Sequence, residues 1–219
     1  MGKKRLEDAI QKINHPIEVI YRCFELDPTS PRDVKENIYE KLSKKYGMSM
    51  EQARASTRNI VQMAKEVGLD YQLDNQILTN TFDAHRLTMF AKAQGKMSEM
   101  TERILRAYFT ETKHIGDHAT LTDLAAEVGL DREAVAAMLA SNEMAEAVQA
   151  DEQTAREYGI TAVPFFLINK KYALTGAQPT EVFIEAIQKI ITTDEITRLN
   201  GQDSDGLICD ENGCEIPKK

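Results

Sequence analysis

Two cysteines near the carboxyl end of the chain, Cys209 and Cys214, have a spacing that suits thiol chemistry. The residues between them end in Asn212-Gly213, a pair that favours a tight turn and would bring the two sulfurs together. A dithiol of this kind can exchange with a disulfide through thiolate attack. Acidic residues stand beside both cysteines, however, and like charge raises a thiol pKa and lowers the thiolate fraction. Two interpretations stay open: a redox-active pair, or a tail with incidental thiols.

The second candidate is the dipeptide Val163-Pro164, which opens the apolar run 163–168. This run is suited to a short buried strand. A peptide bond before proline can be cis at a cost of only about 0.5–1 kcal/mol, but cis occurs in only about 5–6% of such bonds. From these residues alone, a trans proline at the start of an edge strand is therefore the expected structure.

The third cysteine and the histidines give weaker signals. Cys23 alternates with apolar residues on one face of a predicted strand, and we expect it to be a small buried hydrophobic residue. His85 lies beside Arg86 on a predicted helix, where it could border a substrate groove or be a structural histidine. His114 and His118 are four residues apart without a third ligand, so the sequence predicts no metal site. No cofactor-binding motif is visible, and we expect no cofactor.

Composition limits the partners. The 219 residues include 27 basic and 35 acidic side chains, a formal net charge of −8. Nucleic acid and anionic membrane surfaces require a basic footprint, so we expect neither as a partner. No stretch approaches the roughly 20 apolar residues of a membrane span. Because no secretory signal is visible either, the predicted location is the cytoplasm.

The elements that would position these residues change type along the chain. A helix is predicted over residues 3–14 and a strand over 17–24, where β-branched and aromatic residues gather. Helical periodicity then dominates residues 32–158. Short apolar runs at 163–168 and 172–174 predict a β-hairpin that leads into a last helix. A strand and a hairpin separated by a helical block indicate an α/β fold whose sheet is interrupted by a helical insertion.

Several motifs occur in a fixed order along the chain. They are Gly-Lys-Lys-Arg-Leu-Glu at 2–7, Phe-Glu-Leu-Asp-Pro at 24–28, Asn-Thr-Phe-Asp-Ala-His-Arg at 80–86, Gly-Ile-Thr-Ala-Val-Pro-Phe-Phe at 159–166, Thr-Gly-Ala-Gln-Pro at 175–179 and Val182-Phe183. Together they resemble the FrnE-type branch of the DsbA family of thiol–disulfide oxidoreductases. The resemblance implies a thioredoxin-like domain formed by residues 1–31 and 159–193, a helical insertion at 32–158 and an acidic tail at 194–219.

The resemblance also implies roles for single residues. Val163-Pro164 would be a cis-proline loop that faces the active-site disulfide and pairs its backbone with a bound peptide. Some family members are similar in carrying a second, C-terminal C-x₄-C, as Cys209 and Cys214 do here. The Cys-x-x-Cys of the family has no counterpart, because Met1 stands just after its position. We therefore expect the first strand to be missing, through a start that lies upstream or through loss of this part of the gene.

The function that the resemblance implies is exchange of dithiols and disulfides on protein substrates, impaired in the chain as it stands. Two alternatives stay open. One is a glutathione-dependent isomerase or transferase of the hydroxychromene-carboxylate isomerase branch, which shares the proline loop and would make glutathione a partner. The other is a non-catalytic, chaperone-like protein that binds its partners in a helical groove. The enzyme class stays undecided, because the N-terminal nucleophile that would discriminate is absent from the sequence.

Overall fold

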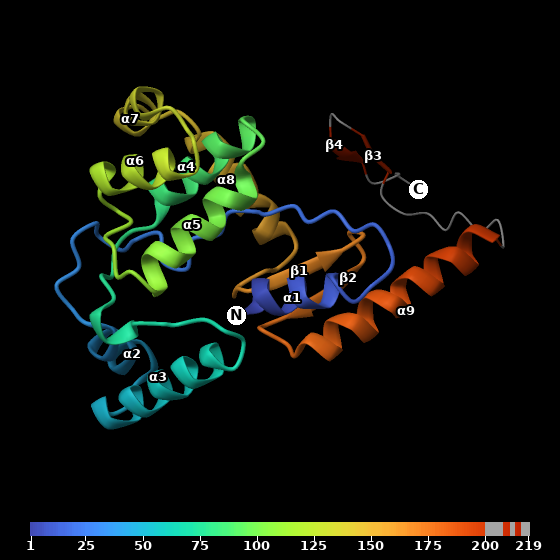
Figure 1. Ribbon diagram of the computed structural model, residues 1–219, viewed down its shortest axis with the longest axis horizontal. Coiled ribbons are helices and arrows are strands. Elements are labelled where there is room, and N and C mark those ends of the chain that lie inside the picture. Colours follow the sequence, from blue (N-terminus) through green and yellow to red (C-terminus); the bar gives the residue numbers. More distant parts are fainter. Residues whose placement is uncertain (200–207, 211–212, 216–219) are drawn as a thin grey trace.

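The computed structural model of the protein describes residues 1–199, 208–210 and 213–215, with side chains up to residue 193 (Figure 1). Helices make up most of it. In chain order the helices are α1 Gly2–Ile10, α2 Ile38–Tyr46, α3 Met50–Lys65, a 3₁₀ turn at Leu73–Asn75, α4 Phe82–Ala93, α5 Met97–Phe109, α6 His118–Glu127, α7 Arg132–Ala140, α8 Ala145–Glu157 and α9 Thr180–Leu199. The strands are β1 Phe165–Ile168, β2 Tyr172–Thr175, β3 Ile208–Asp210 and β4 Gly213–Glu215.

A small α/β layer joins the two ends of the sequence. Strands β1 and β2 form the antiparallel hairpin expected from the sequence, and α1 packs against α9 beside it (Figure 1). The turn places Asn169 and Lys170 at positive φ, which suits a type I′ hairpin turn. Phe166 of β1 meets the fully buried Phe183 of α9 edge-on, with ring centroids 4.8 Å apart. This contact anchors the hairpin to the core of the layer.

The helices of residues 82–157 form a second core. Apolar residues of α4 to α7 make one continuous buried cluster, in which Leu87, Met100 and Leu124 are fully covered. Helix α4 is central, because it packs against α5, α6, α7 and α8. Helices α2 and α3 pair with each other and begin at capping boxes on Asn37 and Ser49.

The strand predicted over residues 17–24 is wrong. Residues 17–25, called the extended segment below, contain no helix or strand and join no sheet among the described residues. A strand is defined by its hydrogen-bonded neighbour, and here the backbone N–H groups of Cys23 and Glu25 donate to side chains of α8 instead. The described sheets are therefore the two separate hairpins β1–β2 and β3–β4. The predicted first helix is confirmed in place, although it ends at Ile10. The division into domains stays a prediction.

Candidate functional site

The Val163-Pro164 loop lies directly against the first turn of α1. The peptide bond between these residues is cis, as the family resemblance implied. A Cβ atom on Gly2 would lie 2.8 Å from Cγ of Pro164 and 3.2 Å from Cζ of Phe166, so only glycine allows this approach. The carbonyl of Pro164 accepts a hydrogen bond of 2.8 Å from the N–H of Gly176. The loop is thus held between a helix N-terminus and the end of β2.

This arrangement has a definite electrostatic character. The N-terminus of a helix carries a partial positive charge and unpaired N–H groups, which stabilise an anion such as a thiolate. Val163 remains 43% exposed beside it, so the chain immediately before the proline is open to a partner. The site could therefore accommodate both an extended peptide and a developing negative charge on sulfur.

Tyr71 connects α5 to the first turn of α1, beside the Val163-Pro164 loop. Its hydroxyl lies 3.0 Å from the backbone nitrogen of Met1, and its ring stacks on Phe109 with centroids 4.8 Å apart. Burial raises the pKa of this phenol. Nothing in the local sequence singles out Tyr71, because the residues that place it lie 38 positions later and at the start of the chain. Lys3 adds a second connection between α1 and α5, because it forms an ion pair of 2.6 Å with Glu102 of α5 as well as one of 2.6 Å with Glu7 of its own helix.

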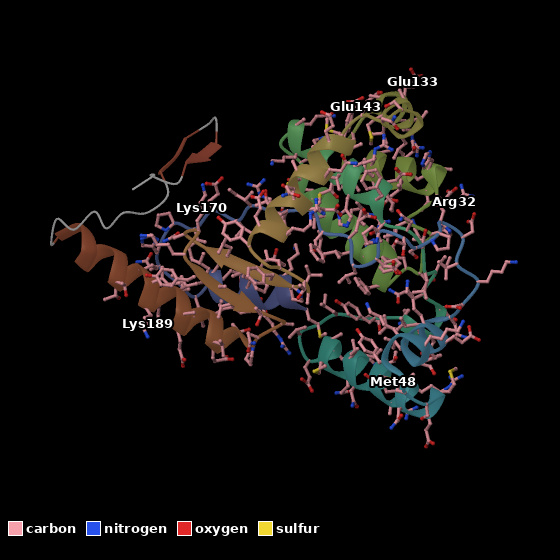
Figure 2. The ribbon with its side chains drawn as sticks, turned by 180° about the vertical axis from the view of Figure 1, so that it is seen from behind. Arg32, Met48, Glu133, Glu143, Lys170 and Lys189 are labelled. Carbon is pink, nitrogen blue, oxygen red and sulfur yellow. The ribbon has the colours of Figure 1, made fainter. Side chains whose placement is uncertain are left out.

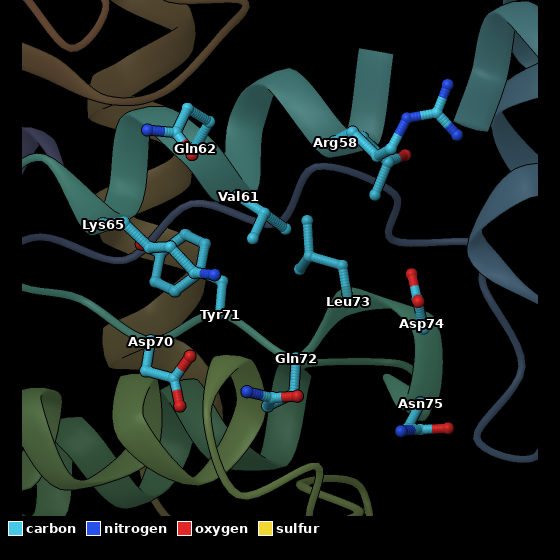
Figure 3. A pocket seen from close by; sticks show the side chains of 11 residues that line it. Arg58, Val61, Gln62, Lys65, Asp70, Tyr71, Gln72, Leu73, Asp74 and Asn75 are labelled. Atoms are coloured by element: carbon cyan, nitrogen blue, oxygen red, sulfur yellow. The ribbon is translucent and has the colours of Figure 1, made fainter. Parts of the chain in front are cut away.

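A hollow of about 390 Å³ adjoins Tyr71, between α3 and the segment that follows it (Figure 3). The side chains that line it are Thr57, Arg58, Val61, Gln62, Lys65, Asp70, Tyr71, Gln72, Leu73, Asp74 and Asn75. Val61 and Leu73 face its middle in Figure 3. Two cations come from α3, and two carboxylates come from the opposite wall. The hollow therefore offers two positive and two negative side chains to a polar peptide segment.

His85 lies elsewhere, on α4 beneath the 23–25 segment. Burial lowers the pKa of its imidazole, against the smaller opposing effects of Glu152, the Phe24 backbone and Asp151. The ring is therefore neutral at neutral pH. The sequence left open whether this histidine borders a substrate groove. The structure holds it with α4, α8 and the extended segment, whereas Pro164 is held by α1 and the β1–β2 hairpin.

Comparison with known proteins shows the family of the chain. Residues 1–188 match the family model of the DSBA-like thioredoxin domain. The chain belongs to this family. The uncharacterized protein YwbO of Bacillus subtilis is 33% identical over 189 residues, which cover 85% of this chain and 88% of that protein. The fold is accordingly a DsbA-like thioredoxin fold, and the family is one of thiol–disulfide oxidoreductases.

Several solved structures share this fold. A probable DsbA oxidoreductase of Streptomyces coelicolor has a TM-score of 0.82 and 36% identity, covering 99% of this chain and 93% of that one. A 2-hydroxychromene-2-carboxylate isomerase has a TM-score of 0.67 at 15% identity, covering 89% of this chain and 90% of its own. The cytosolic disulfide reductase DsbM of Pseudomonas aeruginosa has a TM-score of 0.58 at 16% identity, covering 88% and 92%. The last two are too distant to show more than the shared fold.

The three cysteines of this DsbA-like chain lie in two different parts of it. Cys23 is 2% exposed, and burial, followed by the charge of Asp151, raises its pKa to about 12. This thiol is inert, as its predicted burial implied. Cys209 and Cys214 stand directly opposite each other in the β3–β4 hairpin. Their side chains, and Asn212 of the predicted turn, lie outside the described residues.

Two further expectations concern metals and membranes. Within the part of the chain that the structure describes, no three histidine, cysteine or acidic side chains are arranged to hold a metal ion. Among the same residues, no helix combines the length and apolar character that crossing a bilayer requires.

Proposed function

We propose that the protein is a FrnE-type thiol–disulfide oxidoreductase that acts on protein dithiols and disulfides, with Cys209 and Cys214 as a redox-active pair. The observation that carries this proposal is the cross-strand register of these two cysteines. Directly opposed residues of an antiparallel pair have Cα atoms about 4.5–5.5 Å apart. A disulfide needs a Cα separation of about 4.4–6.8 Å. The pair can therefore close into a disulfide without rearrangement of its hairpin.

The reaction follows from this dithiol. The thiolate of one cysteine attacks a substrate disulfide, forms a mixed disulfide and releases one substrate thiolate, which takes up a proton. The second cysteine then loses its proton and attacks the mixed disulfide. This step closes the Cys209–Cys214 bond and releases the other substrate thiol. Two electrons pass from the pair to the substrate, and the reverse sequence oxidises a substrate dithiol when the relative reduction potentials favour it.

The loop at Val163-Pro164 supports a protein substrate in this proposal. The exposed chain at Val163 offers backbone groups for pairing with an extended peptide. The hollow beside Tyr71 supplies charged walls for a neighbouring polar segment of the same substrate. Glutathione is the small thiol that we propose to reset the pair.

Thiol trapping of the full chain, followed by mass mapping of peptides, tests the pair across a range of glutathione poises. We expect a Cys209–Cys214 bridge that opens and closes reversibly, while Cys23 stays a buried thiol. Cys23→Ser is the control variant and should leave the transition unchanged, whereas Cys209→Ser and Cys214→Ser each abolish it.

The proposal fails if the two cysteines never pair at any poise. Insulin reduction and RNase refolding assays extend the test to protein substrates. A chain that is inactive in both assays but suppresses aggregation would be a binding protein instead.

A further inference from the structure

A group of titratable side chains outside the proposed redox site lies where the extended segment meets α8 and α4. The backbone N–H of Cys23 donates to Oδ2 of Asp151 over 2.8 Å, and that of Glu25 donates to Oε1 of Glu152 over 3.2 Å. Consecutive carboxylates of α8 thus hold alternate residues of the segment. These contacts fasten residues 23–25 to the helix without any strand pairing.

The side chain of Glu25 is enclosed at this junction. The residue is 9% exposed, and its Oε1 atom is buried with no hydrogen-bond partner among the described residues. An ionised carboxylate in such a position is unfavourable, because it has lost its hydration and gained no counter-ion. A protonated carboxyl avoids the charge and becomes an O–H donor. The geometry therefore favours a proton on this group.

The neighbours of Glu25 increase that preference. Glu152 faces it from α8, and Asp27 follows it on its own segment. Arg22 forms its ion pair with Asp151, at 2.9 Å. His85 of α4 brings no cation at neutral pH, since burial lowers its pKa, and Asn80 contributes only a neutral hydrogen bond. Burial first and the charge of Glu152 second raise the pKa of Glu25 to about 7.

We propose that a protonated Glu25 carboxyl and the Glu152 carboxylate form a pH-sensitive clasp that fastens the end of the extended segment to α8. With the proton present, the Glu25 carboxyl donates to the Glu152 carboxylate and the pair carries one negative charge. Loss of the proton leaves two adjacent carboxylates in a poorly hydrated place. Their repulsion loosens residues 23–25 from the helix.

The direction of the pH effect follows from linkage. The folded protein keeps the Glu25 proton up to about pH 7, whereas the unfolded chain loses it near the ordinary value of 4.5. Between these two values the folded state binds more protons, so the contribution of Glu25 to stability falls as the pH rises. His85 acts in the opposite sense, because its lowered pKa favours the folded state as the pH rises towards its ordinary 6.5. The test must therefore isolate Glu25.

Glu25→Gln provides that isolation, because glutamine keeps the shape of the protonated acid at every pH. We expect the melting temperature of the variant, relative to wild type, to rise by about 5 °C between pH 5 and pH 8. Glu133→Gln is the matched control; its side chain is exposed on α7 (Figure 2) and its difference from wild type should stay constant. Hydrogen exchange, corrected for intrinsic rates, should show residues 23–25 losing protection over this range in wild type only.

A Glu25→Gln difference that stays as constant as the control would overturn the clasp. Infrared spectroscopy of wild type keeps the test valid even if the variant does not fold. A protonated-carboxyl band should disappear between about pH 6 and 8, and its absence at pH 5 would equally end the proposal. Glu152→Gln should move this loss to lower pH, because the neighbouring charge has gone. None of these measurements depends on the cysteine pair or on redox activity.

Discussion

The guanidinium of Arg86 lies in the interior of the helical block and fastens several elements together. Its Nε donates to the carbonyl of Glu143 at 2.8 Å, its Nη2 to that of Met138 at 2.6 Å, and its Nη1 to the carboxylate of Asp83 at 2.7 Å. The residue is only 4% exposed. The 80–86 motif therefore has a structural role, because its Arg86 connects α4 to the end of α7 and the start of α8.

Replacement of Arg86 by methionine should destabilise the protein by roughly 3–5 kcal/mol, because it leaves several buried carbonyls without a donor and leaves Asp83 with His118 as its remaining partner. Urea unfolding monitored by circular dichroism measures this change. Arg132→Met is the matched control: its ion pair with Asp123 is exposed, and we expect a change below about 1 kcal/mol. Similar losses in the two variants would contradict the role given to Arg86.

At the scale of elements, local signals predicted much of the fold, and long-range partners decided the rest. The cap at Ser49 and the β1–β2 hairpin follow from residues within a few positions of one another. The strand predicted over 17–24 failed because Cys23 finds its acceptor 128 residues away, on Asp151. The candidate site divides in the same way. Pro164 was identified from its motif, whereas Tyr71 reaches the site only through tertiary contacts.

The role of Asp151 in holding the extended segment gives a prediction for this element. Asp151→Ala should destabilise the protein by about 1–3 kcal/mol, since the buried N–H of Cys23 loses its acceptor. Hydrogen exchange should show the loss first at residues 22–25. Asp123→Ala, which removes an exposed carboxylate, serves as the control and should leave this segment protected. Unchanged exchange at Cys23 in Asp151→Ala would show that another group satisfies its backbone.

At the scale of the whole molecule, two carboxyl groups respond to pH in opposite directions. Glu25 belongs to the junction of the extended segment with α8, and Glu111 follows α5, where it meets Arg103 at 2.8 Å and Arg106 at 2.6 Å. Although partial burial opposes it, the hydrogen bonds from these arginines and from Lys113 lower the pKa of Glu111 to about 2. The contribution of Glu111 is complete above its ordinary value of 4.5 and is lost as the pH falls towards 2. One group thus weakens the fold towards neutrality, and the other weakens it in acid.

Glu111→Gln should therefore cost up to about 3 kcal/mol at pH 6 and almost nothing near pH 2, because the favourable charge has already been neutralised there. Thermal unfolding from pH 2 to 8 measures, in one series, the loss of stability in acid and the loss towards neutral pH. Glu133→Gln is again the exposed control. Since Glu25 and Glu111 belong to separate clusters, the double variant with Glu25→Gln should show the sum of the two single effects at each pH. A cost for Glu111→Gln that is equal at pH 6 and pH 2 would mean that its arginine contacts do not depend on charge. The loss of stability in acid would then come from other carboxylates, such as Asp117. The pKa of Asp117 is also lowered, first by the hydrogen bond from the backbone N–H of Thr120.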